Sequence, residues 1–134
     1  MTAVVAKFDG RERKGARIGP MMRGLSAQSD PQPARTAMIK AVLDGVAAGS
    51  LSDAAPLTRG SRKDFGNGKV DELAGMSPLA FLREESVAGR PIERHGGKVD
   101  RVLFYQASIA GKPKYLLVYL TADGLFTDYD VVDI

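Results

Sequence analysis

Apolar residues recur at three- and four-residue spacing in one stretch of the chain, between Pro33 and Ala48. A repeat of this kind places the apolar side chains on one stripe of an amphipathic helix. Gly49 follows directly, where a residue in the left-handed conformation commonly ends a helix. The pattern therefore predicts a helix over 33–48, whose buried stripe consists of Met38, Ile39, Val42, Leu43, Val46 and Ala47.

Shorter helical pieces are predicted on both sides of a glycine-rich stretch. One runs from 51 to 57, with Ser50 or Ser52 as its N-cap. Residues 58–69 are predicted to form a loop. They are similar to a phosphate-binding loop, but their glycines and lysine stand in a different order and no buried strand precedes them. Residues 70–74 add one helical turn.

Another helix is predicted from Ser77 to Gly89. Ser77 is a natural N-cap, Pro78 suits the first helical position, and Gly89 would close the element. Leu79, Phe81 and Leu82 would form the apolar side of this helix.

After Gly89 the period of the apolar residues changes to two, as in β-strands. Turns are predicted at Gly96-Gly97, at 110–112 and at Asp123-Gly124, a dipeptide common in hairpins. Because these connections are short, consecutive strands are expected to be antiparallel neighbours. The predicted strands cover residues 91–95, 99–109, 114–121 and 125–132.

The hairpin turns determine which side chains share a face of the sheet. An even-length turn near Gly111 places Val102, Phe104 and Gln106 on the face of Tyr119. A three-residue turn with a bulge at Gly124 would instead move Asp128 and Asp130 to the opposite face. With a two-residue turn at Asp123-Gly124, Phe126 shares the face of Tyr119, and the predicted pairs are Ala122 with Leu125, Tyr119 with Asp128, Leu117 with Asp130, and Tyr115 with Val132.

Both faces of this predicted sheet are apolar, whereas a solvated antiparallel sheet normally alternates apolar and polar residues. One face is expected to pack on the helices, and the other to meet a partner, a second copy or the N-terminal arm. The predicted fold class is thus α+β, with two or three N-terminal helices packed on a curved, cone-like antiparallel meander of about four strands.

The charge of the chain divides it into two parts. Its formal net charge is +3, but residues 1–24 alone hold six Lys and Arg against two Asp and Glu. Residues 1–32 are therefore interpreted as a basic arm rich in Gly and Pro, solvated and poorly ordered, and residues 33–134 as the domain. A basic arm can also bind phosphate or anionic lipid.

Composition excludes several kinds of site. The chain has no Cys and one His, which excludes disulfides and thiolate metal sites, and no metal or cofactor is expected. No apolar run approaches the roughly 20 residues that span a bilayer. The first residues place charges where a signal peptide has its apolar segment, so a cytoplasmic location without a membrane partner is expected.

The order of elements resembles the nuclear transport factor 2-like superfamily, also called ketosteroid isomerase-like or cystatin-like. The resemblance rests on TAMIKAVLDGVAAGSLSDAAPL, on VDRVLFYQASIAGK and on KYLLVYLTADGLFTDYDVVD. It covers residues 33–134. It implies a sheet that wraps the helices as a cone, a pocket between them, and dimers formed through the outer face of the sheet.

The resemblance also implies candidate site residues. Members that catalyse place a carboxylate base and a hydroxyl donor in the cone, and here Asp128, Asp130 and Tyr119 are of the right types. His95 is interpreted as an exposed residue at a strand end, without a catalytic role. The candidate ligand-binding residues are Phe104, Tyr115, Leu117, Tyr119 and Phe126.

Three functions follow from these observations. The first is a non-enzymatic domain that binds a small apolar ligand or associates with a protein partner, expected as a homodimer through the sheet. The alternative is a cofactor-free isomerase or hydro-lyase, which predicts Asp128 or Asp130 in an enclosed pocket with a tyrosine within hydrogen-bond reach. Nucleic-acid binding through the basic arm is ranked last, because the domain lacks a basic, aromatic-studded sheet surface.

Overall fold

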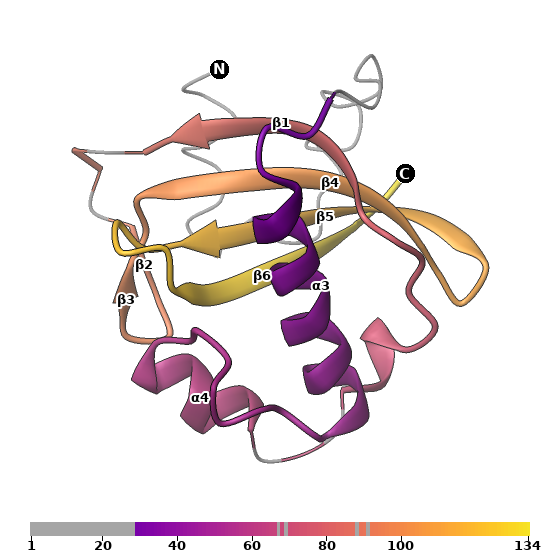
Figure 1. The fold of residues 1–134 in the computed structure, drawn as a ribbon, viewed down its shortest axis with the longest axis horizontal. Helices are drawn as coiled ribbons and strands as arrows, with labels where there is room; N and C mark the ends of the chain where they lie inside the picture. Colours follow the sequence, from indigo (N-terminus) through magenta and orange to yellow (C-terminus); the bar gives the residue numbers. More distant parts are fainter. Residues whose placement is uncertain (1–28, 67, 69, 88, 91) are drawn as a thin grey trace.

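The computed structural model describes residues 29–66, 68, 70–87, 89–90 and 92–134. Figure 1 shows the helices on one side of a curved antiparallel sheet. The helices are α3, Pro33–Ala48, and α4, Arg59–Phe65, and a single 3-10 turn, η1, covers Asp71–Leu73. The basic arm up to residue 28, and with it the nucleic-acid hypothesis, lies outside the described residues.

Four strands form the sheet, in the order β1-β4-β5-β6, and every neighbouring pair is antiparallel. A two-stranded hairpin stands beside it. This architecture confirms the predicted α+β class. The strands are β1 Ala80–Ser86, β4 Arg101–Ile109, β5 Lys112–Leu120 and β6 Phe126–Asp133, and the hairpin consists of β2 Glu93–Arg94 and β3 Gly97–Lys98.

Helix α3 forms over the residues predicted for it. Its apolar stripe is buried, and Gly49 ends it in the left-handed conformation with φ 69°, donating its N–H to the carbonyls of Gly45 and Val46. In the described part of the chain no helix is long and apolar enough to cross a bilayer.

The helix predicted at 51–57 is wrong, as is the loop predicted at 58–69. Pro56 has no N–H and disfavours helical geometry in the residue before it, which prevents a helix there. The helix begins instead after Thr58, whose hydroxyl accepts a hydrogen bond from the backbone N–H of Ser61 at 3.2 Å. The predicted helical turn at 70–74 is present as η1.

The helix predicted from Ser77 to Gly89 is also wrong, because residues 80–86 form β1. The strand pairs with β4, and the alternation of side chains along it places Phe81 and Leu82 in different cores, with a register shift between Phe81 and Arg83. Long-range pairing with β4 thus overrides local helix signals. The predicted strand at 91–95 is reduced to the two residues of β2.

The turn between β4 and β5 has an even number of residues, as predicted. Ala110 and Gly111 both have positive φ, 54° and 81°, which a two-residue hairpin turn of the mirror-image type requires. Gln106 therefore pairs with Tyr115, Phe104 with Leu117, and Val102 with Tyr119. These pairs confirm the predicted register.

The turn between β5 and β6 differs from the prediction, yet the important pairs survive. Thr121 and Leu125 are hydrogen-bonded partners around three turn residues, so the predicted Ala122–Leu125 pair is wrong. A register shift after Tyr119 then leaves Thr127 as an extra residue. The two irregularities cancel, and the pairs Tyr119 with Asp128, Leu117 with Asp130 and Tyr115 with Val132 are as predicted.

Each face of the sheet has its own apolar core. The face toward α3 packs Leu103, Leu116, Val118 and Phe126 against the helix stripe. The opposite face is buried within the single chain as well, so its apolar side chains require no second copy to leave water. This second core contains Leu82, Val87, Ile92, Val99, Val102, Phe104, Tyr115, Leu117, Tyr119 and Val132.

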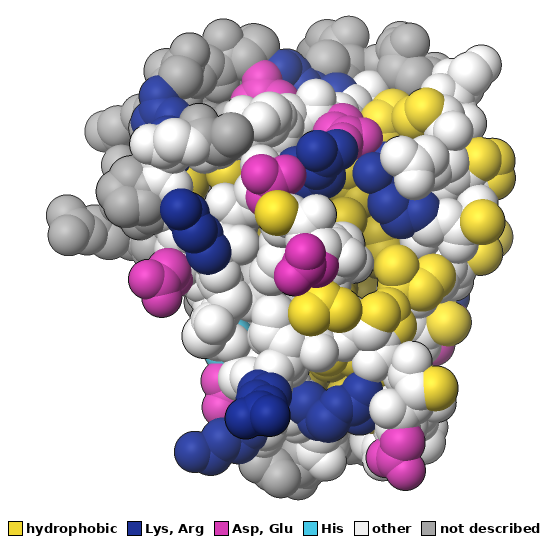
Figure 2. All heavy atoms as spheres, turned by 60° about the vertical axis from the view of Figure 1, so that its left-hand side comes forward, with side chains coloured by type: hydrophobic (Ala, Val, Ile, Leu, Met, Phe, Trp, Pro, Cys, Tyr) yellow, Lys and Arg dark blue, Asp and Glu magenta, His cyan; other side chains and the backbone are white. Residues whose placement is uncertain are grey.

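The molecular surface is uneven in charge and polarity (Figure 2). Lys and Arg side chains gather at the lower end of this view, at the height of α4 in Figure 1, and α4 carries Arg59, Arg62 and Lys63. An apolar hollow of about 240 Å³ lies between α3 and residues 51–56.

Candidate functional site

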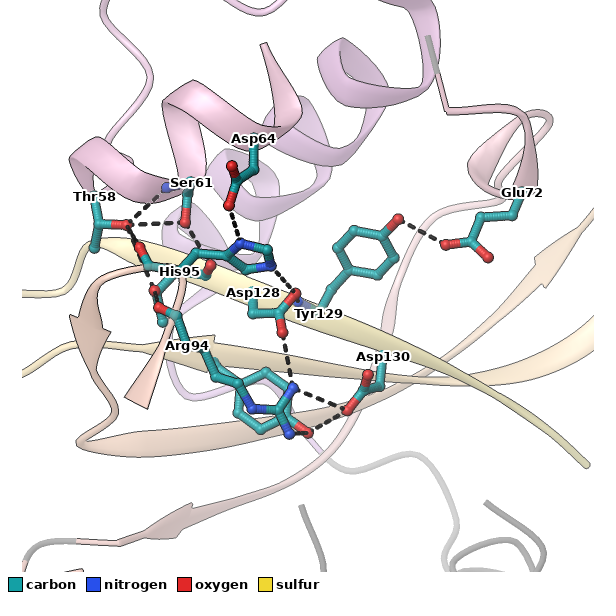
Figure 3. Close-up of polar contacts among 11 residues, drawn as sticks. Thr58, Ser61, Asp64, Glu72, Arg94, His95, Asp128, Tyr129 and Asp130 are labelled. Atoms are coloured by element: carbon teal, nitrogen blue, oxygen red, sulfur yellow. Dashed lines mark hydrogen bonds and ion pairs between the residues drawn. The ribbon is translucent and has the colours of Figure 1, made fainter. Parts of the chain in front are cut away.

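A buried guanidinium lies beside two aspartates, Asp128 and Asp130 (Figure 3). Arg94, the last residue of β2, is 7 % exposed. Its Nη1 donates a hydrogen bond to Asp128 Oδ2 at 2.8 Å and lies 3.6 Å from Asp130 Oδ2. Its guanidinium carbon stands 4.3 Å from the centroid of the Tyr119 ring, a cation–π distance. One arginine therefore holds two carboxylates in fixed positions.

Tyr119 completes this cluster. Its hydroxyl donates to Asp130 Oδ2 at 2.5 Å and lies 3.4 Å from Nη2 of Arg94. Burial raises the pKa of the Tyr119 phenol well above its ordinary value of 10, and the charge of Asp130 raises the pKa further, against the opposing effect of Arg94. The phenol therefore stays neutral and remains a hydrogen-bond donor.

The bulge at Thr127 brings these side chains onto one face. Asp128 and Asp130 are two residues apart and so share a face of β6, next to Tyr119 on β5. Without the extra residue, the three-residue turn would rotate both aspartates toward α3. The position of the carboxylates thus depends on a local irregularity of the hairpin.

Helix α4 and the β2–β3 turn approach each other closely beside this cluster. Thr58 Oγ1 donates to the carbonyl of His95 at 3.2 Å, and the Thr127 hydroxyl donates to the carbonyl of Arg94. A Cβ atom added at Gly60 would overlap the carbonyl oxygen of His95. Only glycine at this point of α4 permits the approach that positions the turn.

His95 stands between two carboxylates at the outer side of the cluster (Figure 3). Its Nδ1 contacts Asp64 Oδ2 of α4, and its Nε2 lies 3.4 Å from Asp128 Oδ1 of β6. The ring also contacts that of Phe65, with the centroids 4.8 Å apart and the ring planes tilted by 59°. The side chain of His95 is 27 % exposed, so this residue is half-buried and not exposed as predicted.

A pocket of about 380 Å³ opens beside β6 at this point. Tyr129 donates its hydroxyl to Glu72 at 2.7 Å, and the rings of Tyr129 and Phe65 lie 5.6 Å apart. The lining thus combines carboxylates, aromatic rings and one imidazole. Its residues are Phe65 from α4, Glu72 from η1, His95 from the hairpin turn, and 128–131 from β6.

This composition suits an organic cation better than a metal ion. Carboxylates form charge-assisted hydrogen bonds with ammonium and guanidinium groups, and aromatic faces attract the same groups. Within the described ranges, no three His, Cys, Asp or Glu side chains are grouped so that they could hold a metal. A larger hollow of about 440 Å³, lined by Lys98, Asp100 and Asp123 among others, contains none of the buried charged side chains.

The structure brings together only some of the predicted site residues. Tyr119, Asp128 and Asp130, the candidate catalytic group, form one cluster. Of the candidate ligand-binding residues, Phe104, Tyr115, Leu117 and Tyr119 lie in the core facing away from α3. The prediction that Phe126 shares their face is wrong, since the three-residue turn pairs it with Leu120 and places it in the opposite core. None of these five lines the pocket beside β6.

Residues that the sequence did not single out complete the site. Arg94 lies in a two-residue strand, and nothing in its local pattern distinguishes a buried arginine from a solvated one. Asp64 and Phe65 lie in a helix that was predicted as a loop, and Glu72 lies in an ordinary helical turn. For this region the sequence offered one signal, the predicted pairing of Tyr119 with Asp128.

Comparison of the chain with protein-family models, with curated proteins and with solved structures finds no match.

Proposed function

We propose that this chain is a small-ligand-binding domain without catalytic activity, and that its site is the pocket beside β6. The observation that carries the proposal is the lining of this pocket, in which Glu72, Asp128 and Asp130 meet the rings of Phe65 and Tyr129. We propose a small organic cation as the ligand, in place of the apolar ligand expected from the sequence, because carboxylates dominate the polar lining.

Preorganisation supports this proposal. Asp128 is fixed by Arg94 and by its own hydrogen bond from the backbone N–H of Tyr129 at 2.8 Å. Asp130 is fixed by Tyr119. A site whose charged groups are already ordered loses little conformational entropy when a ligand binds. The buried cluster, which is costly to desolvate, is thus explained as a support for the pocket.

The proposal is tested by titrating the protein with butylguanidinium and with butylurea, a neutral molecule of the same shape. Amide shifts of Glu72, His95 and Tyr129, followed by NMR, are expected to saturate with the cation alone. Glu72→Gln is expected to weaken binding about fivefold, since one charge-assisted contact is worth about 1 kcal/mol. Its matched control is Glu93→Gln, an exposed carboxylate outside the pocket. Equal binding of both probes, or no saturation, would overturn the proposal.

The family likeness and the homodimer belong to the same proposal. Helix α3 packing on a curved four-stranded antiparallel meander supports membership of the nuclear transport factor 2-like superfamily (Figure 1). A homodimer through the sheet would use surface other than the apolar side chains of the outer core, which are buried within one chain. Sedimentation equilibrium tests the homodimer. A protein that is still monomeric at 100 µM, about the upper range of ordinary dimer affinities, would contradict the homodimer.

A second candidate function is acid–base catalysis without a cofactor. The observation in its favour is the contact of Tyr119 with Asp130, together with the position of both aspartates beside the pocket. In this reading one carboxylate removes a proton from a carbon next to a carbonyl group. An aminoketone incubated in D₂O with the protein would then exchange that proton. Asp130→Asn would abolish exchange, whereas the exposed control Asp133→Asn would retain it; no exchange by the native protein excludes this candidate.

A further inference from the structure

The imidazole of His95 has a carboxylate oxygen opposite each of its nitrogens. A neutral imidazole carries one N–H, so it can donate to only one carboxylate and turns a lone pair toward the other. The protonated ring pairs with both, through a hydrogen bond to Asp64 and a longer ion pair of 3.4 Å with Asp128. The geometry is therefore complete only when His95 is charged, and loss of its proton must break or weaken one of the contacts.

The groups around His95 determine which contact yields. Asp128 of β6 is 3 % exposed in its side chain and is held by Arg94, whereas the side chain of Asp64 on α4 is 48 % exposed. The remaining charged groups of the pocket are Glu72 and Asp130. The contact with Asp64 is a hydrogen bond, whereas that with Asp128 is a longer ion pair of 3.4 Å, so loss of the proton at Nε2 gives up the contact with Asp128, which Arg94 keeps in position.

We infer that His95 is the proton-linked specificity residue of the pocket: an organic cation binds when His95 gives up its proton, and a protonated His95 excludes the cation. This inference rests on the proposed function. A charged imidazolium in the wall of the pocket repels a ligand cation and occupies Asp128. Removing that charge leaves the carboxylates to the ligand, which is expected to bind about tenfold more tightly, as for a charge pair at an effective dielectric constant of a partly solvated site.

The test is calorimetric titration with butylguanidinium from pH 5.5 to pH 8.0, repeated in two buffers of different ionisation enthalpy. His95 is the single histidine of the chain, so no other imidazole contributes to the result. We expect affinity to rise about tenfold across this range, with proton release on binding at the lower pH. In His95→Gln the affinity is expected to change less than about twofold over the same range.

A second measurement covers the case in which the variant does not fold. The ring protons of His95 in the native protein are followed by NMR against pH, with and without saturating butylguanidinium. The midpoint of this titration is expected to fall by about one pH unit on saturation, as linkage to a tenfold effect requires. An unchanged midpoint, a pH-independent affinity of the native protein, or a pH dependence retained in His95→Gln would overturn the inference. Absence of binding at pH 8.0 would instead overturn the proposed function.

Discussion

The two faces of the sheet are buried to the same degree but differ in what they bury. The face toward α3 encloses apolar side chains and two tyrosines, Tyr105, whose hydroxyl lies 3.0 Å from that of Thr36, and Tyr129. The opposite face encloses Arg94 and two aspartates in addition to its apolar residues. One face therefore stabilises the fold, while the other holds charges in place at a cost in stability, as functional sites do.

The largest effect is expected from breaking the charged cluster. Arg94→Met leaves Asp128 and Asp130 buried without their guanidinium, which should lower the free energy of unfolding by about 3–5 kcal/mol. Replacing all three side chains together by Met, Asn and Asn should restore a large part of that loss. On the other face, Leu43→Ala should cost about 3 kcal/mol by leaving a cavity, with no such rescue available. Urea unfolding measures the stability of all three variants. An Arg94→Met protein as stable as the native one would contradict the proposed difference between the two faces.

A smaller effect is expected where α4 meets the hairpin turn of the charged face. In an isolated helix Gly60→Ala would be stabilising by about 1 kcal/mol. Here the added Cβ overlaps the carbonyl of His95, so the substitution should instead destabilise the protein by about 1–3 kcal/mol. Gly68→Ala is the control, because nothing lies within 4 Å of the added atom. Thermal unfolding of both variants shows whether each substitution raises or lowers the stability. A stabilised Gly60→Ala protein would contradict the close approach of α4 to the carbonyl of His95.

Sequence patterns predicted the parts of this molecule that depend on local periodicity. Helix α3 and the alternation in β4, β5 and β6 follow from apolar residues at fixed spacing. The patterns failed at β1, where Ser77 and Pro78 imitate a helix start while the segment is held by pairing with β4. They also failed at α4, whose short helix depends on Thr58 and on contacts with β6.

The site was predictable as far as it depends on the register of neighbouring strands. Asp128, Asp130 and Tyr119 were brought together by register alone, although the two-residue turn used to derive it does not exist and a bulge restored the pairing. Arg94 and His95 reach the site through a hairpin of two-residue strands, whose position depends on tertiary contacts. Periodicity carries no information about such contacts.

Unfolding at alkaline pH tests how the buried Tyr119 contributes to the stability of the charged face. Its pKa is raised in the folded state, by burial and by Asp130, so the unfolded chain loses this proton first as the pH passes 10. The stabilisation is complete below pH 10 and is lost as the pH rises, by about 1.4 kcal/mol per pH unit for a single group. Tyr119→Phe should remove part of this slope, and Tyr105, whose pKa burial also raises, should account for another part. Urea unfolding at pH 9 and pH 11 measures the slopes; equal slopes in the variant and the native protein would contradict this account.

The smallest effect is expected from an ion-pair cluster outside the site. Burial raises the pKa of the Glu84 carboxyl, but Arg35, at 2.8 Å, and Arg101 outweigh burial, and the pKa lies below its ordinary value of 4.5. The stabilisation is present above pH 4.5 and is lost as the pH falls through the lowered pKa. Glu84→Gln should cost about 0.5–1 kcal/mol at pH 7, and the difference from the native protein should vanish in acid. Urea unfolding of both proteins at pH 7 and pH 3 measures this difference in the free energy of unfolding. A difference that is larger at pH 3 than at pH 7 would contradict the prediction.

Intermolecular nuclear Overhauser effects with bound butylguanidinium show whether the pocket beside β6 holds a small organic cation. We predict contacts from the butyl protons to the ring protons of Phe65 and Tyr129, which lie 5.6 Å apart in the wall of the pocket. Contacts confined to the apolar hollow between α3 and residues 51–56 would contradict this prediction, because the ligand would then be held by its alkyl chain and not by the carboxylates.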